Sequence, residues 1–185
     1  MVLRSGLKIA GKYWSSRKPI AEYDCATDVS GPDAVGLWHG CGQRVADDAT
    51  RSGSAWEHTS EKKPGLVHTI YGPYVNDMGR PGYVRVRFRI SGAGFGQVAE
   101  GAIVLDVNQI LHDVPPKHIT VGQTVVRAKD LTHQYRWHDV ICYTSGVGVY
   151  EYRARVLDGA FDETRQRVRF DVVHVYRHFP VWEFL

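Results

Sequence analysis

One segment of the chain alternates strictly between apolar and polar side chains over eight residues, from position 83 to position 90. The apolar set is Val84, Val86, Phe88 and Ile90, and the polar set is Tyr83, Arg85, Arg87 and Arg89. A period of two places successive side chains on opposite faces of an extended backbone. The pattern therefore predicts a β-strand with one face on a core and the other toward solvent. Pro81 and Gly82, which precede it, are typical of a turn.

Two later segments are also predicted to be long strands. In residues 149–156, Tyr150, Tyr152, Ala154 and Val156 are expected to face inward, and Glu151, Arg153 and Arg155 outward. In residues 168–176, we expect Phe170, Val172, His174 and Tyr176 on one face and Asp171, Val173 and Val175 on the other. Since both faces of this segment carry apolar groups, it is predicted to lie in the middle of a sheet.

Shorter strands are predicted at residues 66–71, 102–107, 123–128 and 135–143, with weaker candidates at 3–9, 35–39 and 55–58. A short helix or turn is expected at residues 108–112, ahead of Pro115 and Pro116. Strands that do not alternate with helices favour an all-β fold, an antiparallel β-sandwich or jelly roll of about eight to ten strands. We expect residues 1–185 to form a single β-sandwich domain, with residues 1–35 as an N-terminal extension or its first strands.

Composition excludes several classes of protein. Hydrophobic residues at 43% and charged residues at 23% are ordinary for a folded domain. No apolar run is long enough to span a bilayer, and no signal peptide is visible, so the compartment stays open with the cytoplasm as the default. A net charge of +3 does not predict a nucleic-acid binder.

The three cysteines, Cys25, Cys41 and Cys142, form no CxxC pair and are odd in number. This count argues against a zinc site or a dense disulfide framework. We expect buried free thiols, although a bridge between Cys25 and Cys41 is left open.

Several motifs follow one another in an order that resembles a known family. Residues 42–55 (GQRVADDATRSGSA) resemble a Ser-Gly loop that leads into a second strand. The segment YGPYV at 71–75, followed by GRPGYVRVRFR at 79–89, resembles a strand pair of the pattern Gly-Pro-Tyr … Gly-x-Tyr-x-Val-x-Phe-Arg. Residues 103–107, 151–156 and 168–175 resemble later strands of the same domains. The family is that of the galactose-binding-like β-sandwiches, and within it the carbohydrate-binding modules.

This resemblance implies a non-catalytic domain that binds glycans through loop aromatics. Sugars present apolar C–H faces to flat rings and hydroxyls to polar groups. The candidates at predicted strand ends are Trp38, His39, Trp56, Tyr74, Asn76, Asp77 and Arg80. Trp38, Trp56 and Tyr74 would stack on the sugar while the others fix its hydroxyls. The alternative is that Trp56 and Tyr74 only close the ends of the core.

Arginines form a second signal. Arg85, Arg87 and Arg89 share one strand face, and Arg153 and Arg155 share a similar face of another strand. If the two strands are neighbours, five guanidinium groups lie on one surface and would suit an anionic polysaccharide, because guanidinium forks pair with carboxylates and sulfates. The alternative is a solvated face with acidic side chains interleaved.

The resemblance also implies a structural calcium ion, and Glu22 and Asp171 are the acidic residues that match. A histidine-based metal site is not favoured, because no His-x-His pair occurs and the nine histidines are scattered. No nucleophile elbow, P-loop or dinucleotide fingerprint is present either.

Two other functions stay open: a protein-interaction or assembly domain of a surface-polysaccharide system, oligomeric in some form, and, less favoured, a jelly-roll metalloenzyme.

Overall fold

The computed structural model describes residues 18–27, 36–62, 65, 67–76, 81–96 and 100–178. The alternating segment forms most of β7 (Gly82–Ala93), and its four apolar side chains are each at most 1% exposed. The arginines between them point to the other face of the strand. Burial of the apolar set determines which face of β7 points toward the core, because a shift of its pairing register by one residue would turn every arginine into the core.

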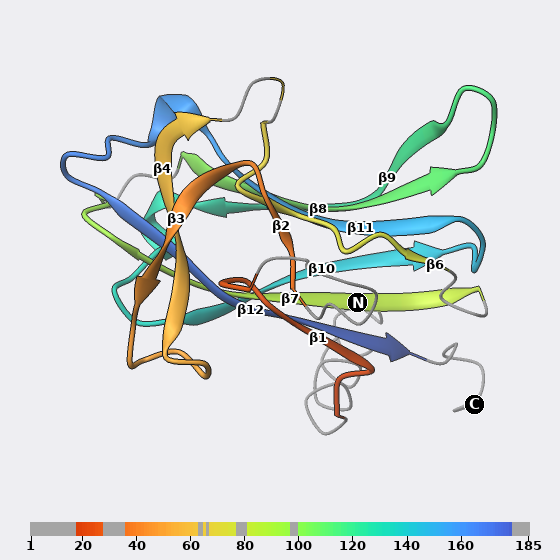
Figure 1. The fold of residues 1–185 in the computed structure, drawn as a ribbon, viewed down its shortest axis with the longest axis horizontal. Helices are drawn as coiled ribbons and strands as arrows, with labels where there is room; N and C mark the ends of the chain where they lie inside the picture. The colour runs from red at the N-terminus through yellow and green to blue at the C-terminus, as the bar shows by residue number, and fades with distance from the viewer. Residues whose placement is uncertain are drawn as a thin grey trace, which may run out of the picture.

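The described residues form two six-stranded sheets that pack face to face, with antiparallel pairing between all neighbouring strands (Figure 1). Sheet A contains, in spatial order, β10 (Arg136–Thr144), β7, β12 (Arg167–His178), β4 (Ser54–Lys62) and β3 (Cys41–Ala46), and β1 (Ala21–Asp24) pairs with β12. Sheet B contains β2 (Trp38–His39), β5 (Ile70–Tyr71), β11 (Val149–Val156), β8 (Gly101–Leu111) and β9 (Lys117–Arg127), and β6 (Val75–Asn76) pairs with β11. The predicted antiparallel β-sandwich is confirmed.

Two short 3-10 turns, Ala128–Asp130 and Asp158–Ala160, complete the regular structure of the described residues. The described residues contain twelve strands rather than the eight to ten expected, because the sequence pattern predicted β2 and β5 but not β1, β3 or the two-residue β6. The weak candidate at 3–9 lies outside the described residues. No helix in the part of the chain that the structure describes is long and apolar enough to cross a membrane.

The core lies between the two sheets and is closed by large aromatic side chains. Phe88 and Phe170 come from sheet A, and Tyr150 and Tyr152 come from sheet B. All three cysteines are buried free thiols, which confirms that expectation and shows no bridge between Cys25 and Cys41.

β12 is central, as predicted, but its two faces differ from the prediction. Its pairing with β7 shifts between Phe170 and Val173, which marks a β-bulge. The bulge adds one residue, so Phe170 and then Val173 and Val175 face the core, while His174 and Tyr176 face outward. A strict period of two cannot anticipate this switch, because the extra residue appears only in the pairing with a neighbouring strand.

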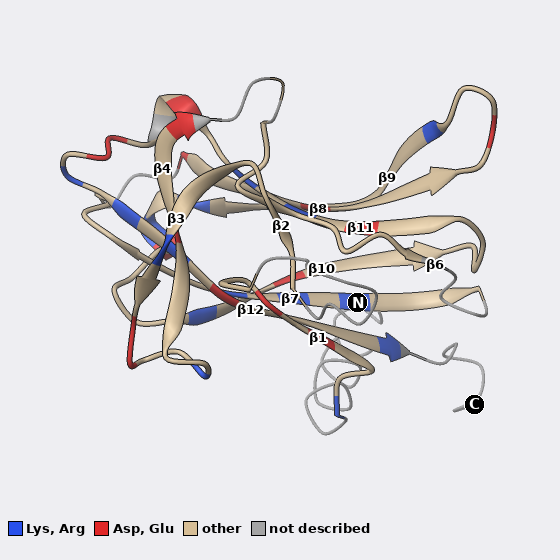
Figure 2. Cartoon of the chain, viewed as in Figure 1, with Lys and Arg blue, Asp and Glu red and all other residues tan. Residues whose placement is uncertain are grey.

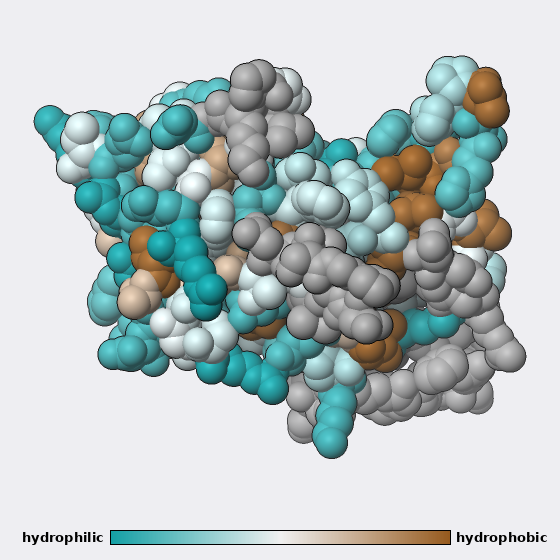
Figure 3. Space-filling model, in the orientation of Figure 1, coloured by the Kyte–Doolittle hydropathy of each residue, from teal (hydrophilic) through white to brown (hydrophobic). Residues whose placement is uncertain are grey.

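The short helix or turn expected at residues 108–112 is wrong. Asn108 and Gln109 continue β8, where they pair with Thr120 and Ile119 of β9 in a long hairpin that projects from the sandwich (Figure 1). The two prolines before β9 lie in its turn. Figure 3 shows hydrophobic residues gathered around this hairpin on an otherwise largely hydrophilic face.

The five arginines do not share one surface. β7 belongs to sheet A and β11 to sheet B, so their outer faces lie on opposite sides of the sandwich. Acidic residues are interleaved with the basic ones along the strands (Figure 2). In sheet A, Asp139 of β10 is ion-paired with both Arg85 and Arg87, and Arg89 is ion-paired with Asp171.

Candidate functional site

The outer face of sheet B brings aromatic and hydrogen-bonding side chains into one row. Trp38 lies opposite Tyr71 in the register of β2 and β5. Since Ile70 pairs with Ala154, Tyr71 is followed across the sheet by Arg153 of β11. Arg153 pairs with Asp106 of β8. Antiparallel partners on one face are close enough to interact, so the row runs from an aromatic end to a charged end.

Trp38 is 43% exposed, although it is among the largest side chains of the chain. Its ring lies directly over the backbone of Gly72, where a Cβ atom would stand 2.8 Å from Trp38 Cδ1. Gly72 also has a φ of 105°, a value that L side chains rarely adopt. A glycine is therefore required at this position for the ring to lie flat against the sheet.

Tyr74 is the second exposed ring on this face, at 41% exposure. It is the one non-glycine residue with positive φ, 62°, among those described. Burial and the nearby charge of Glu151, to whose carboxylate the hydroxyl is hydrogen-bonded, raise the pKa of Tyr74 to about 12. A left-handed backbone costs a tyrosine roughly 1–2 kcal/mol, so the surrounding contacts hold this ring in place.

A polar network lies beneath the rings. Glu151 is only 5% exposed, and it accepts a hydrogen bond from Asn108 Nδ2 at 3.3 Å. Arg153 joins both acids of the network: its Nε lies 2.6 Å from Asp106 Oδ1 and its NH1 3.6 Å from Glu151 Oε2. These outer-face groups are thus paired with one another, whereas the sequence predicted only that Glu151 and Arg153 face outward.

Two further groups border this row. His68 has its pKa lowered to about 4, first by burial and then by the positive charges of Arg153 and Arg155, so its imidazole is neutral at neutral pH. Arg155 lies two residues beyond Arg153 on the same face of β11 and is exposed, and it has no acidic partner among the residues the structure describes. We refer to Trp38, Tyr71, Tyr74, Arg153, Arg155, Asp106 and Glu151 as the sheet B surface.

The structure places Trp56 and His39 away from this surface. His39 faces inward from β2, and its ring stacks on Trp56 of β4 with centroids 3.5 Å apart and an angle of 10°. Trp56 Nε1 donates to the carbonyl of Cys41 at 2.8 Å, and His39 Nε2 lies 2.7 Å from the carbonyl of Cys25. The stacked pair joins the two sheets at one end of the core, which is the alternative reading that the sequence left open for Trp56.

The remaining predicted binding residues are only partly described. Asn76 lies in β6, close to Tyr74 in the chain, but its side chain falls outside the described residues, as do Asp77 and Arg80. Sequence reasoning missed Tyr71, Arg153, Asp106 and Glu151 as members of one surface. The alternation of β11 marked two of them as outward-facing, but only the strand order shows what they face.

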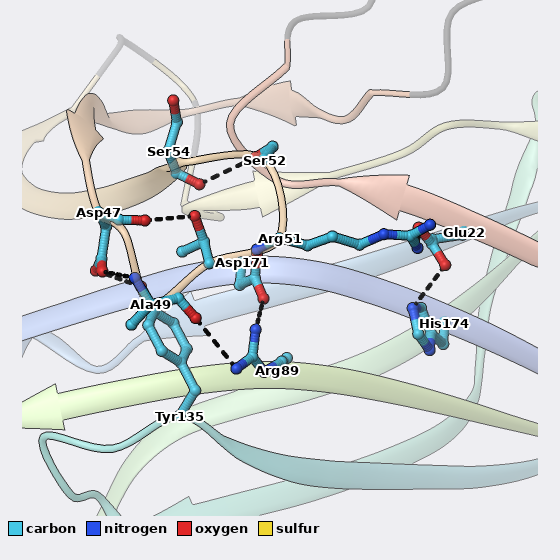
Figure 4. Close-up of polar contacts among 11 residues, drawn as sticks. Glu22, Asp47, Ala49, Arg51, Ser52, Ser54, Arg89, Tyr135, Asp171 and His174 are labelled. Carbon is cyan, nitrogen blue, oxygen red and sulfur yellow. Dashed lines mark hydrogen bonds and ion pairs between the residues drawn. The ribbon is translucent and has the colours of Figure 1, made fainter.

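The two predicted calcium ligands, Glu22 and Asp171, do lie near each other, on a pocket of about 270 Å³ (Figure 4). Both carboxylates are already engaged by guanidinium groups: Glu22 by Arg51 and Asp171 by Arg89. In the described part of the chain, no group of three or more His, Cys, Asp or Glu side chains is arranged to hold a metal ion. The residues as arranged therefore do not fit calcium, which takes six to eight oxygen ligands.

No protein-family model matches this chain, and no curated protein sequence matches it. Solved structures match its fold. A carbohydrate-binding module from lichenase 5A of Cellvibrio mixtus, in complex with cellotriose, matches with a TM-score of 0.50 and 10% identity over 87% of this chain and 99% of that one. A family 35 carbohydrate-binding module from Clostridium thermocellum matches with a TM-score of 0.49 and 15% identity over 84% of this chain and 98% of that one. At 10% identity the first likeness shows a common fold, so the expected β-sandwich of this type is confirmed.

Proposed function

We propose that this domain binds carbohydrate on the sheet B surface and does not act on it chemically. The observation that carries the proposal is the pair of exposed rings, Trp38 and Tyr74, set beside a fixed row of hydrogen-bonding groups. The fold, which matches a module solved with cellotriose, supports the same function.

The chemistry of the surface suits a sugar chain. An exposed indole and an exposed phenol offer flat apolar faces for the C–H groups of successive sugar rings. Arg153, which stays partly exposed at the charged end of the row in front of the buried Asp106, offers guanidinium donors for hydroxyl groups. Since Arg153 is held by this ion pair, little side-chain freedom is lost when a ligand binds, which favours affinity.

The carboxylates on this surface are not placed for hydrolysis. Glycoside hydrolysis requires two carboxyl groups on either side of the scissile bond, one of them protonated. Here Glu151 is buried, and Asp106 and Glu151 both lie against the same guanidinium group of Arg153. This arrangement favours binding without catalysis.

Arg155 favours an acidic polysaccharide as the ligand. It lies about 7 Å along β11 from Arg153, the length of two strand residues. Its neighbour across β8 is the apolar Val104, so no acidic side chain stands opposite it in that strand pair. A guanidinium group at this place suits the carboxylate of a uronic acid or a sulfate ester on a neighbouring sugar.

Affinity electrophoresis against a panel of soluble neutral and acidic polysaccharides tests the proposal, with calorimetry for each positive polymer. We expect retardation by at least one polymer, with a dissociation constant below about 1 mM. Absence of retardation by every polymer, from a protein shown to be folded, contradicts the proposal.

The acidic ligand has its own test. Arg155→Gln is expected to weaken binding to the acidic polymer several-fold and to leave a neutral polymer of the same backbone unaffected, because only the charged substituent meets Arg155. Arg165→Gln is the matched control, since Arg165 is exposed and lies in the loop between β11 and β12, outside the sheet B surface. Equal loss for both polymers contradicts the assignment to acidic sugars.

A second candidate function is protein contact through sheet A. Tyr83 and Tyr143 lie opposite each other on β7 and β10, with ring centroids 5.4 Å apart in an edge-to-face arrangement, and Ile141 lies next to them. All three are exposed, and such apolar patches are typical of interfaces. Analytical ultracentrifugation of wild type and Ile141→Lys tests it: a stable oligomer that the variant breaks supports contact between copies through this patch, and a monomer at all concentrations contradicts it.

A further inference from the structure

Three carboxylates gather at one place in the fold, where β1 meets β12. Glu22, Asp24 and Asp171 line one pocket with Arg51, Ser52 and Val172. Carboxylates that lie this close repel one another unless cations or hydrogen-bond donors neutralise them. Figure 4 shows the guanidinium groups of Arg51 and Arg89 beside two of them, Glu22 and Asp171.

Asp171 is the most buried of the three, at 1% exposure. Its Oδ2 atom is ion-paired with the guanidinium group of Arg89, and its Oδ1 atom lies 3.4 Å from the backbone nitrogen of Arg51. Burial raises the pKa of Asp171, while Arg89 opposes that rise. An ionised carboxylate at this depth requires a partner, and Arg89 is the one that touches it.

Arg89 is itself held on several sides. Its NH2 group donates to the carbonyl of Ala49 at 3.2 Å, and its Cζ atom lies 4.9 Å from the ring centroid of Tyr135. The hydroxyl of Tyr135 donates to Asp47 at 2.8 Å. The loop between β3 and β4 is thereby fixed to β7 through Arg89.

Arg51 neutralises the second carboxylate. It extends from the same loop across the pocket to Glu22 of β1, whose other oxygen lies 2.9 Å from His174 Nε2 (Figure 4). Asp24 accepts a hydrogen bond from the backbone nitrogen of Ala26 at 2.8 Å. Each acidic group of the pocket thus has a donor supplied by the chain.

We infer that Arg51 and Arg89 provide the counter-charge of this acidic pocket, so the fold of this chain requires no structural calcium ion. A divalent cation placed between the carboxylates would have to displace two guanidinium groups and collect further oxygens. The inference does not depend on carbohydrate binding, since it concerns the stability of the domain.

Thermal unfolding in millimolar calcium chloride and in millimolar EDTA tests the inference on the wild-type protein. A structural site with calcium at about 100-fold excess over its dissociation constant would raise the unfolding midpoint by roughly 5–10 °C. We expect the two midpoints to agree within about 1 °C, far below that shift. A saturable rise with calcium overturns the inference.

Variants test the role of Arg89 separately. Arg89→Gln leaves the buried carboxylate of Asp171 without its charge partner, so we expect the midpoint to fall by roughly 10 °C in calcium and in EDTA alike. Adding Asp171→Asn removes the stranded charge and is expected to recover much of the loss. Arg165→Gln, on an exposed loop, is the control. If Arg89→Gln unfolds at the wild-type midpoint, the counter-charge lies elsewhere and the inference fails; if it does not fold at all, the wild-type calcium comparison decides.

Discussion

The hydroxyl of Tyr74 is hydrogen-bonded to the buried carboxylate of Glu151, and this contact orients an exposed ring whose backbone has a φ of 62°. The carboxylate is held in turn by Asn108 and Arg153. The exposed ring therefore stands on a rigid polar support, although the residue that carries it is strained.

This relationship predicts coupling between the two residues. Tyr74→Phe removes the hydroxyl and Glu151→Gln removes the charge, and each is expected to weaken glycan binding, because the ring loses its fixed orientation. In a double-mutant cycle the two losses overlap, with a coupling energy of about 0.5–2 kcal/mol. Tyr83→Phe on sheet A is the matched control, and strictly additive losses would show that Glu151 does not position Tyr74.

Gly72→Ala is expected to disturb the other ring. The added Cβ atom would stand 2.8 Å from Trp38 Cδ1, and the backbone φ of 105° is unfavourable for alanine. We expect a loss of about 1–3 kcal/mol in the free energy of unfolding together with weaker glycan binding. Gly159→Ala, where a Cβ atom meets no other atom within 4 Å, serves as the control. Unchanged stability and affinity in Gly72→Ala would show that Trp38 does not depend on this contact.

Trp56→Ala tests whether Trp56 contributes to the core or to the binding surface. Removing the ring that stacks on His39 is expected to lower the free energy of unfolding by about 3 kcal/mol. Glycan affinity, measured well below the unfolding temperature, is expected to stay at the wild-type value. Lost affinity in a folded Trp56→Ala protein would place Trp56 back among the binding residues.

His68 predicts a pH dependence of stability. Its pKa is about 4 in the folded protein and near 6.5 when unfolded, because burial and the charges of Arg153 and Arg155 disfavour the imidazolium, although Asp106 partly offsets them. Between these values the unfolded chain binds the proton more readily, so stability falls as the pH drops from about 6.5 to 4. Denaturant unfolding of wild type and His68→Gln at several pH values is expected to show a smaller acid loss in the variant. Parallel losses in both proteins would assign the pH dependence to other groups.

The sequence predicted what depends on local periodicity and missed what depends on pairing. The eight alternating residues correctly predicted which face of β7 points inward, and the apolar side chains expected in the core are buried there. The bulge in β12 could not be predicted, because it is a property of the register between two strands. The sheet B surface could not be predicted either, since Trp38, Tyr71, Arg153 and Asp106 come from four separate segments, two of which form strands of only two residues.

The prediction of an arginine surface shows the same limit. Alternation placed the arginines of β7 and β11 outward, but it could not show that the two strands belong to different sheets. Nor could it show that Asp139 and Asp171 neutralise the arginines of β7. Once the ion pairs of the other four arginines are known, Arg155 is the one of the five without an acidic partner among the described residues.

The most direct test of carbohydrate binding is a calorimetric titration of wild type, Trp38→Ala and Tyr143→Ala with the polysaccharide that retards the protein in electrophoresis. Trp38 and Tyr143 are similarly exposed rings on opposite sheets, at 43% and 52%. We expect Trp38→Ala to weaken binding by roughly tenfold or more, which corresponds to about 1.4 kcal/mol, and Tyr143→Ala to bind as wild type does. Wild-type affinity in Trp38→Ala, with loss in Tyr143→Ala, would contradict the sheet B surface as the binding site.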